Sequence, residues 1–311
     1  MKYAAIGYSM PNDVEFIDGT KLKGIMGGGP FFAYSGLKLS TDDCLFIASI
    51  GADFEKYYKD WFDSNGCSRD ALFLRTDNSI YFYVKYLPDG TYEEGTIFTD
   101  EYDKVCWAEN FIVASEIEKY VADGMKGLYL YGHNMDNLYC RTIQGYKDKY
   151  GLKIGWEFPQ AYRLKGNGED DLERLFKLVD YYSLNRKEAY KYFGVSTDRD
   201  AVEAIKKVGI PCYFRVGQDG AYWIDKGEDL FMPMISVCPE REIDPTGCGN
   251  ISTAAAMWAY FEGYDPLRIC LWAGICAGYN AMQYGPYPEV NAKTRAEAMK
   301  LMEELYSKYR K

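Results

Sequence analysis

The sequence predicts an α/β fold whose central sheet is mainly parallel and covered by helices on both faces. Short apolar runs that read as strands alternate with segments in which apolar residues recur near positions i, i+3 and i+4. The strand-like runs are residues 2–7, 44–51, 127–132, 152–158, 179–184 and 211–217, and 169–178 and 198–208 are examples of the helical segments. Such alternation is typical of parallel sheets buried on both faces. No repeat period divides the 311 residues, so we expect one domain spanning 1–311.

One segment, approximately residues 79–98, departs from this alternation. Ile80, Phe82, Val84 and Tyr86 alternate with polar or tyrosine positions, and a turn around residues 88–90 precedes a second strand-like stretch. This predicts an antiparallel hairpin outside the central sheet. Residues 14–25 around Asp18 could pair with it to form a small β-lid inserted in the domain. An edge hairpin with no role in ligand binding explains the pattern equally well.

Composition excludes several classes of function. The net charge is −10 with 36 Lys and Arg residues, so no broad basic surface is available for a nucleic-acid backbone. The longest stretch without charge, residues 269–288, contains Asn280, Gln283 and two prolines, which favours a buried helix running into a loop over a membrane span. Nine scattered cysteines form no CxxC pair and indicate reduced thiols, and residues 1–10 do not resemble a secretory signal. We therefore expect a cytoplasmic protein.

The most informative stretch is residues 244–250, Asp-Pro-Thr-Gly-Cys-Gly-Asn, which leads directly into an alanine-rich helical segment. Glycines at the start of a helix leave backbone N–H groups exposed where the helix dipole also favours an anion. The pattern therefore predicts an anion hole for a phosphate. A glycine-rich loop before a helix that binds nothing is the alternative.

The stretch resembles the D-T-x-G-A-G-D signature of the PfkB/ribokinase family of small-molecule kinases, with the same seven-residue spacing. The resemblance implies a ribokinase-like fold in which Gly247, Cys248 and Gly249 form the anion hole for the transferring phosphoryl group. It places Asp244 beside a monovalent-cation site, for which K⁺ is the candidate. The final aspartate of the family is the base that deprotonates the substrate hydroxyl, and Asn250 stands in its place.

A second element, Asn185-x-x-Glu188, follows a strand-like run and resembles the N-x-x-E motif of the family. The resemblance implies that Asn185 and Glu188 organise Mg²⁺ and the ATP phosphates, with Glu188 reaching the metal through water. The local alternative is strong, because Asn at a helix N-cap with Glu three residues later is also a capping box that needs no ligand.

Two further elements resemble the nucleotide-binding parts of the family. The run Arg215-Val-Gly217-Gln-Asp-Gly220 matches the strand and glycine turn at the nucleotide phosphates, and a small-residue helix around Gly274 matches the one beside adenine. The same residues are explained locally by a hairpin turn and by a close-packed helix contact.

The predicted substrate loop is residues 27–33, which resemble the family pattern G-G-x-P-x-N-x-A. The resemblance implies that the substrate is bound by Asp13, Gly28, Gly29 and Phe32. In it Asp13 accepts hydrogen bonds from the substrate hydroxyl groups. The alternative for Asp13 is a local role as the cap of a strand end. Phe32 replaces an asparagine that contacts the sugar in many relatives, which puts ribose and typical hexoses in doubt and brings cyclitols into consideration. The single histidine, His133, is given no role.

Together these motifs predict an ATP-dependent phosphotransferase, a carbohydrate kinase that uses ATP and Mg²⁺ and acts on an alcohol group of a sugar, cyclitol or nucleoside. An amide cannot take the substrate proton, so Asn250 is expected to impair the reaction. The alternative is a non-catalytic ATP- and sugar-binding sensor of the same fold. A nicotinamide-dependent oxidoreductase is excluded by the lack of a G-x-G-x-x-G fingerprint after the first strand. If lids pair between subunits, the protein is a homodimer.

Overall fold

The computed structural model describes residues 1–88, 92–131, 137–158 and 175–310. Its central feature is a nine-stranded sheet in the order β13-β12-β11-β10-β9-β8-β1-β4-β5. Seven strands run parallel, and β12 and β13 at one edge are antiparallel. The prediction of a mainly parallel sheet is therefore confirmed. The strands are β1 (Tyr3–Tyr8), β4 (Cys44–Gly51), β5 (Leu72–Thr76), β8 (Gly127–Tyr131), β9 (Lys153–Glu157), β10 (Tyr181–Asn185), β11 (Cys212–Arg215), β12 (Gly220–Asp225) and β13 (Glu228–Pro233).

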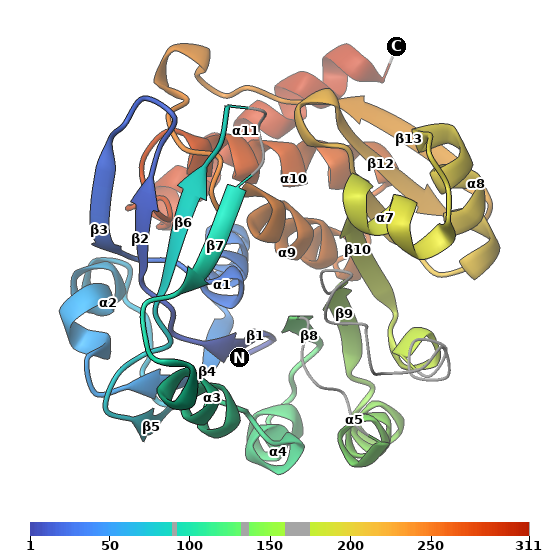
Figure 1. Cartoon of the computed structure of the whole chain (residues 1–311). Helices are drawn as coiled ribbons and strands as arrows, with labels where there is room; N and C mark the ends of the chain where they lie inside the picture. Colours follow the sequence, from blue (N-terminus) through green and yellow to red (C-terminus); the bar gives the residue numbers. More distant parts are fainter. Residues whose placement is uncertain (89–91, 132–136, 159–174, 311) are drawn as a thin grey trace.

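Helices cover both faces of this sheet (Figure 1). Successive side chains of a strand point to opposite faces, and β1 shows the consequence, because Tyr3 and Ala5 belong to one hydrophobic cluster and Ala4 and Ile6 to the other. The first cluster packs against α1 (Gly29–Ser40), α2 (Phe54–Ser64), α9 (Cys248–Phe261), α10 (Pro266–Ala281) and α11 (Ala292–Tyr309). The second packs against α4 (Ala114–Ala122), α5 (Asn137–Tyr150), α7 (Arg186–Phe193) and α8 (Asp198–Val208).

A separate four-stranded sheet, which we call the lid sheet, stands beside the central one (Figure 1). It consists of β2 (Asn12–Glu15), β3 (Lys21–Ile25), β6 (Phe82–Tyr86) and β7 (Tyr92–Thr96), in the order β3-β2-β6-β7. The predicted hairpin outside the central sheet is confirmed, because β6 and β7 pair antiparallel, and the predicted partner segment supplies β2 and β3. The predicted turn falls largely on residues 89–91, which lie outside the described residues.

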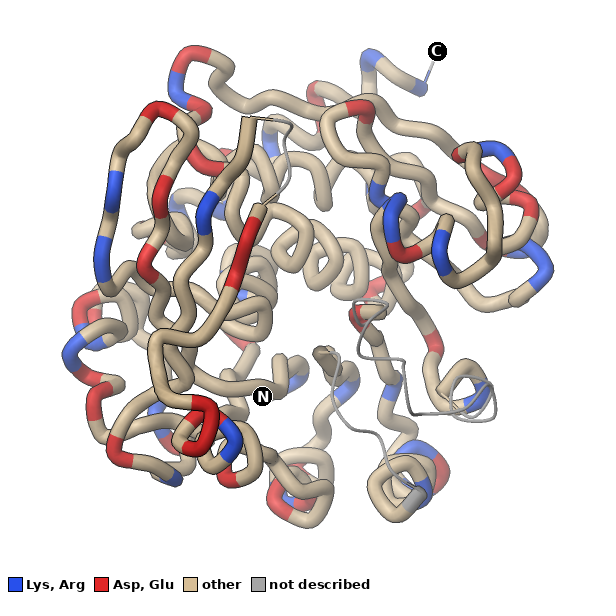
Figure 2. Tube along the Cα trace, in the orientation of Figure 1, with Lys and Arg blue, Asp and Glu red and all other residues tan. Residues whose placement is uncertain are grey.

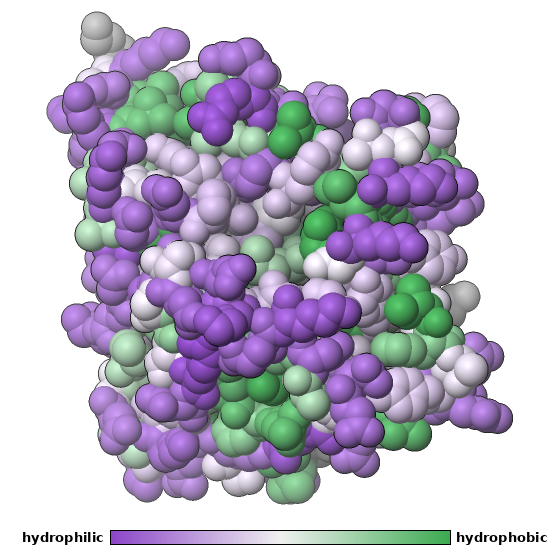
Figure 3. Space-filling view, turned by 90° about the vertical axis from the view of Figure 1, so that its left-hand side faces the viewer, coloured by the Kyte–Doolittle hydropathy of each residue, from purple (hydrophilic) through white to green (hydrophobic). Residues whose placement is uncertain are grey.

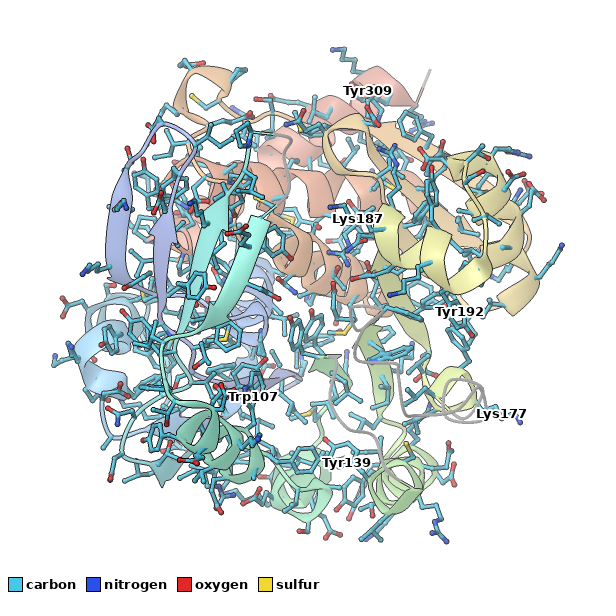
Figure 4. All side chains as sticks on the ribbon, in the orientation of Figure 1. Trp107, Tyr139, Lys177, Lys187, Tyr192 and Tyr309 are labelled. Atoms are coloured by element: carbon cyan, nitrogen blue, oxygen red, sulfur yellow. The ribbon has the colours of Figure 1, made fainter. Side chains whose placement is uncertain are left out.

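A small hydrophobic cluster of Tyr8, Ile80 and Cys106 connects the lid sheet to β1 and to α3 (Asp100–Glu109). Trp107 of α3, at the foot of the lid sheet in Figure 4, places its ring edge-on to Tyr8 at a centroid distance of 5.1 Å and to Phe82 at 6.1 Å. Aromatic contacts of this geometry stabilise beyond the area they bury. The base of the lid sheet is therefore anchored to the central domain.

The uncharged stretch 269–288 contains most of α10, a buried helix that ends before a loop, as predicted. No helix in the described part of the chain is both long enough and apolar enough to cross a membrane. Figure 2 shows acidic and basic residues intermixed around the outside of the trace, whereas the central region around α9 and α10 carries few charges.

Candidate active site

Residues 244–247 form the loop that precedes α9, a helix that begins at Cys248 with Gly247 as its N-cap. Gly247 has φ 81°, and a Cβ atom there would lie 2.2 Å from the ring of Phe32. Only glycine satisfies both conditions. The N–H of Cys248 donates a hydrogen bond to the carbonyl of Pro245 at 3.1 Å and is therefore occupied. An anion at this end of α9 would be bound by the next two N–H groups, those of Gly249 and Asn250.

A cavity of about 500 Å³ opens beside this helix terminus. Four glycines predicted to bind the nucleotide or its phosphates line it, although they come from three separate parts of the chain: Gly217, Gly220, Gly249 and Gly274. At Gly274 a Cβ atom would lie 2.8 Å from Cδ1 of Ile235, so a larger residue would fill the cavity or displace that wall. Arg215, Asp244 and Cys248, also predicted site residues, complete this part of the lining.

Most of the remaining cavity wall was not predicted. It is largely apolar and includes Met232, Met234 and Ile235 after β12, and Cys270 of α10, whereas Ala277 belongs to the small-residue helix predicted beside adenine. An apolar wall facing a few polar groups is typical of sites for small organic ligands such as a nucleobase. The apolar run at 230–235 in the sequence was a usable signal for this wall, but it reads equally well as an edge strand.

Asp244 lies in the cavity wall with only 1% of its surface exposed. Its Oδ1 accepts hydrogen bonds from the backbone N–H of Thr246 at 2.8 Å and from the Thr246 hydroxyl at 2.5 Å. Its Oδ2 and the Oδ1 of Asn280 are buried without a hydrogen-bond partner in the described structure. Burial raises the pKa of Asp244, and Thr246 opposes that effect. Unpartnered buried oxygens are unusual, and these two fit a bound cation.

Asn250, in the first turn of α9, is half-buried. A buried chain of polar groups lies behind this turn, in which the hydroxyl of Tyr129, in the middle of β8, donates to Oε2 of Glu157 at 3.2 Å. Glu157 forms an ion pair with Arg215, whose guanidinium is 3.9 Å from Glu188. Burial raises the pKa of Tyr129, Glu157 and Glu188, the last to about 7, and Arg215 opposes the shift at each of these groups.

This buried chain passes directly behind the predicted anion hole. A Cβ atom at Gly249 would lie 2.3 Å from Nη1 of Arg215, so the guanidinium packs against the helix terminus. Tyr129 and Glu157 were not predicted. Glu157 carries a signal that could have been used, since it is a charged residue at the end of a buried parallel strand, where ligands are bound in such sheets.

Asn185 and Glu188 form the capping box that was the local alternative to a metal site. Asn185 Oδ1 accepts from the N–H of Glu188 at 3.0 Å, and Glu188 Oε2 accepts from the N–H of Asn185 at 2.7 Å. Neither residue lines the 500 Å³ cavity. Among the residues that the structure describes, no cluster of three or more His, Cys, Asp or Glu side chains could hold a metal ion directly.

The predicted substrate residues lie apart from the cavity, around the start of α1. Gly28 is the N-cap of α1, and a Cβ atom at Gly29 would meet the ring of Tyr131 at 2.5 Å. Phe32 is 2% exposed and packs on Gly247, so it shapes the motif rather than presenting a free ring. Asp13 Oδ1 accepts from the N–H of Gly24 at 3.0 Å and from the Tyr81 hydroxyl at 2.6 Å, both within the lid region. His133 lies outside the described residues.

The lid sheet reaches the motif through one polar contact that was not predicted. The hydroxyl of Tyr86 in β6 hydrogen-bonds the hydroxyl of Thr246 at 2.5 Å. The Tyr86 ring stacks on Phe16 with centroids 5.7 Å apart, and both rings line a second cavity of about 280 Å³ together with Pro245 and Tyr284. The tip of the lid sheet therefore lies against the loop that leads into α9.

Comparison with known proteins agrees with this geometry. Residues 158–292 match the family model described as pfkB family carbohydrate kinase. The PfkB resemblance is confirmed. A Schizosaccharomyces pombe protein of uncharacterized function is 22% identical over 92% of this chain and 85% of its own length.

Solved structures establish the ribokinase-like fold. An Escherichia coli protein assigned as a ribokinase II, in complex with ATP and Mg²⁺, superimposes with a TM-score of 0.75 at 17% identity, covering 97% of this chain and 99% of the other. A Burkholderia thailandensis nucleoside kinase in complex with inosine gives a TM-score of 0.70 at 17% identity, covering 98% and 97%. These neighbours share the fold of nearly the whole chain.

Proposed function

We propose that this PfkB-type protein binds ATP with Mg²⁺ in the 500 Å³ cavity and transfers the γ-phosphate to an alcohol group of a sugar, cyclitol or nucleoside. The observation that carries the proposal is the convergence of Gly217, Gly220, Gly249 and Gly274 on one cavity at the N-terminus of α9. Glycines allow a ligand to approach the backbone closely, and the helix terminus favours phosphate. The neighbour that holds ATP and Mg²⁺ supports the assignment of the cavity to a nucleotide.

In this proposal the residues of the chain act by positioning and by electrostatics, which dominate phosphoryl transfer. The N–H groups of Gly249 and Asn250 would stabilise charge on the transferring group. Asn185 and Glu188 would hold Mg²⁺ through water, and the metal would supply charge neutralisation between the phosphates. Asp244 and Asn280 would bind K⁺ through their unpartnered oxygens.

The alcohol substrate would lie between the start of α1 and the lid sheet, bound by Asp13, Gly28 and Gly29. Its hydroxyl would approach Asn250, whose amide accepts a hydrogen bond but not a proton at neutral pH. A sensor that binds ATP and substrate without phosphoryl transfer is the second candidate, and Asn250 is the observation that favours it.

The test combines calorimetry with a thermal-shift panel. ATP with Mg²⁺ should bind, and sugars, cyclitols and nucleosides tested with and without ATP·Mg²⁺ should identify the substrate, because a ligand at about 100 times its Kd adds roughly 2.7 kcal/mol of stability. Gly274→Val serves as the control in which the cavity is filled. Absence of ATP binding at millimolar concentration would reject the kinase and the sensor together.

A homodimer through the lid sheet is part of the proposal. The edge strands of the lid sheet are β3 and β7, and unpaired edges can be covered by another chain. The face of the molecule on the β3 side is mostly hydrophilic, with apolar residues in separate patches (Figure 3), so pairing there would depend on backbone hydrogen bonds. A monomer in sedimentation at micromolar concentration would contradict it.

A further inference from the structure

The two buried oxygens that fit a cation are oriented by one residue, Thr246. Asp244 Oδ1 accepts from the backbone N–H of Thr246 at 2.8 Å and from its hydroxyl at 2.5 Å, whereas Asp244 Oδ2 has no partner in the described structure. Asn280 Nδ2 donates to the carbonyl of Thr246 at 2.7 Å, and Asn280 Oδ1 likewise has no partner there. Both residues are only 1% exposed. Thr246 therefore occupies one end of each side chain and leaves the other end for a ligand.

Thr246 is itself hydrogen-bonded from the lid sheet. Its hydroxyl has a single proton, which goes to Asp244 Oδ1, so the Tyr86 hydroxyl must be the donor in its 2.5 Å contact with Thr246. The hydrogen bonds thus run in one direction, from Tyr86 in β6 through Thr246 to Asp244. Because the Thr246 hydroxyl is engaged both as donor and as acceptor, its orientation is fixed only while the lid sheet is in place.

The lid sheet also contacts the other side of the candidate cation site. The ring of Phe16, which follows β2, stacks on Tyr86 with centroids 5.7 Å apart and lies against Tyr284 with centroids 4.9 Å apart. Tyr284 follows Asn280 by four residues, in the loop after α10. The tip of the lid sheet therefore contacts both the loop that carries Asp244 and the loop that follows Asn280.

We propose that Tyr86 is a positioning residue of a monovalent-cation site: acting through Thr246 it orients the two unpartnered oxygens, and a cation bound there holds the lid sheet against the loop before α9 in return. A buried carboxylate needs a compensating charge, and K⁺ would balance the single charge of Asp244. Coupling between two such events is reciprocal, so each strengthens the other by the same factor. The proposal rests on the proposed function only for the choice of K⁺ as the cation.

The test measures how stability responds to K⁺ in the absence of nucleotide. Tm is recorded against KCl concentration, with choline chloride keeping the ionic strength constant, and the Kd for K⁺ follows from the rise in Tm. In Tyr86→Phe this Kd should be about fivefold higher than in the native protein, the factor that one net hydrogen bond supplies. The matched control is Tyr83→Phe, because Tyr83 lies three residues earlier in β6, on the opposite face of the lid sheet, and is 43% exposed. Its Kd should equal that of the native protein.

A purely structural role for Tyr86 predicts a different result. It would lower Tm by the same amount at every KCl concentration and leave the Kd unchanged, which would overturn the proposal. A native protein whose Tm does not respond to K⁺ would overturn it as well. The reciprocal measurement is hydrogen exchange: saturating K⁺ should slow exchange of the β6 amides by about fivefold in the native protein and should not slow it in Tyr86→Phe.

If Tyr86→Phe does not fold, variants of Thr246 answer the same question. Thr246→Ser keeps the hydroxyl and should retain the native Kd for K⁺, whereas Thr246→Val removes the hydroxyl and should raise the Kd by at least fivefold, or about as much as Tyr86→Phe. Equal Kd values for the two variants would refute the role of the hydroxyl through which Tyr86 acts. If the K⁺ response depends on Tyr86 but ATP does not bind, the proposed kinase function fails and the cation site stands. If ATP binds but Tyr86→Phe responds to K⁺ as the native protein does, the coupling alone fails.

Discussion

Replacing Asn250 by aspartate should raise phosphoryl transfer to the alcohol substrate. A missing general base typically reduces the rate by about 10²–10⁴-fold, which corresponds to about 2.7–5.5 kcal/mol of activation free energy. Aspartate is nearly the same size as asparagine, and residues 244–249, which form the loop and the first turn, do not have to be rebuilt.

The assay is release of ADP with the alcohol that the thermal-shift panel identifies, measured at saturating ATP and Mg²⁺ for the native protein, Asn250→Asp and Asn250→Ala. Only the aspartate variant should gain rate, and KM for the alcohol should change less than kcat, because the amide already holds the hydroxyl in the ground state. If the native protein turns over at an ordinary kinase rate of about 1–100 s⁻¹, position 250 is not the decisive defect and the reasoning is refuted.

Three further changes test other parts of the site. Burial raises the pKa of Glu188 to about 7 from 4.5, so the folded state holds this proton more tightly than the unfolded state, and the Glu188 contribution to stability should fall as pH rises from about 4.5 to 7. Denaturant unfolding at several pH values should show this slope weakened in Glu188→Gln, and an unchanged slope would contradict the shift. Gly274→Val should abolish ATP binding in calorimetry while the circular dichroism spectrum is retained, because even a Cβ atom there lies 2.8 Å from Ile235; native affinity for ATP would remove Gly274 from the site. Tyr86→Phe, which removes the hydroxyl bonded to Thr246, should speed hydrogen exchange in β6 with a loss of about 1 kcal/mol in stability, and unchanged exchange would show that the contact does not hold the lid sheet.

The parts of the molecule that the sequence predicted are those with a local signature. Strand–helix alternation predicted the parallel sheet, and the alternating run at 80–86 predicted the hairpin of the lid sheet, because the twofold and 3.6-fold periods of apolar residues directly report which faces are buried. Gly247 was predicted from a local pattern as well, the glycines that directly precede a helical segment, and its positive φ at the N-cap of α9 explains why glycine stands there. Its contact with Phe32, far away in the sequence, could not be predicted.

Tyr129, Glu157 and Tyr86 could not be predicted in the same way. Tyr129 and Glu157 belong to strands that read as buried core. Glu157 meets Tyr129 and Arg215 only because β8, β9, β10 and β11 are neighbours in the sheet. That order depends on how crossover helices place each strand, which periodicity does not report. Tyr86 meets Thr246 only when the lid sheet lies against the loop before α9, a contact between residues 160 positions apart.

The residue at position 250 decides how the kinase and sensor alternatives should be weighed. An amide that accepts from a substrate hydroxyl binds the alcohol without activating it, which favours slow transfer or sensing over rapid turnover. A small gain in the Asn250→Asp protein would support the sensor, whereas a large gain would show that the rest of the phosphoryl-transfer site is intact.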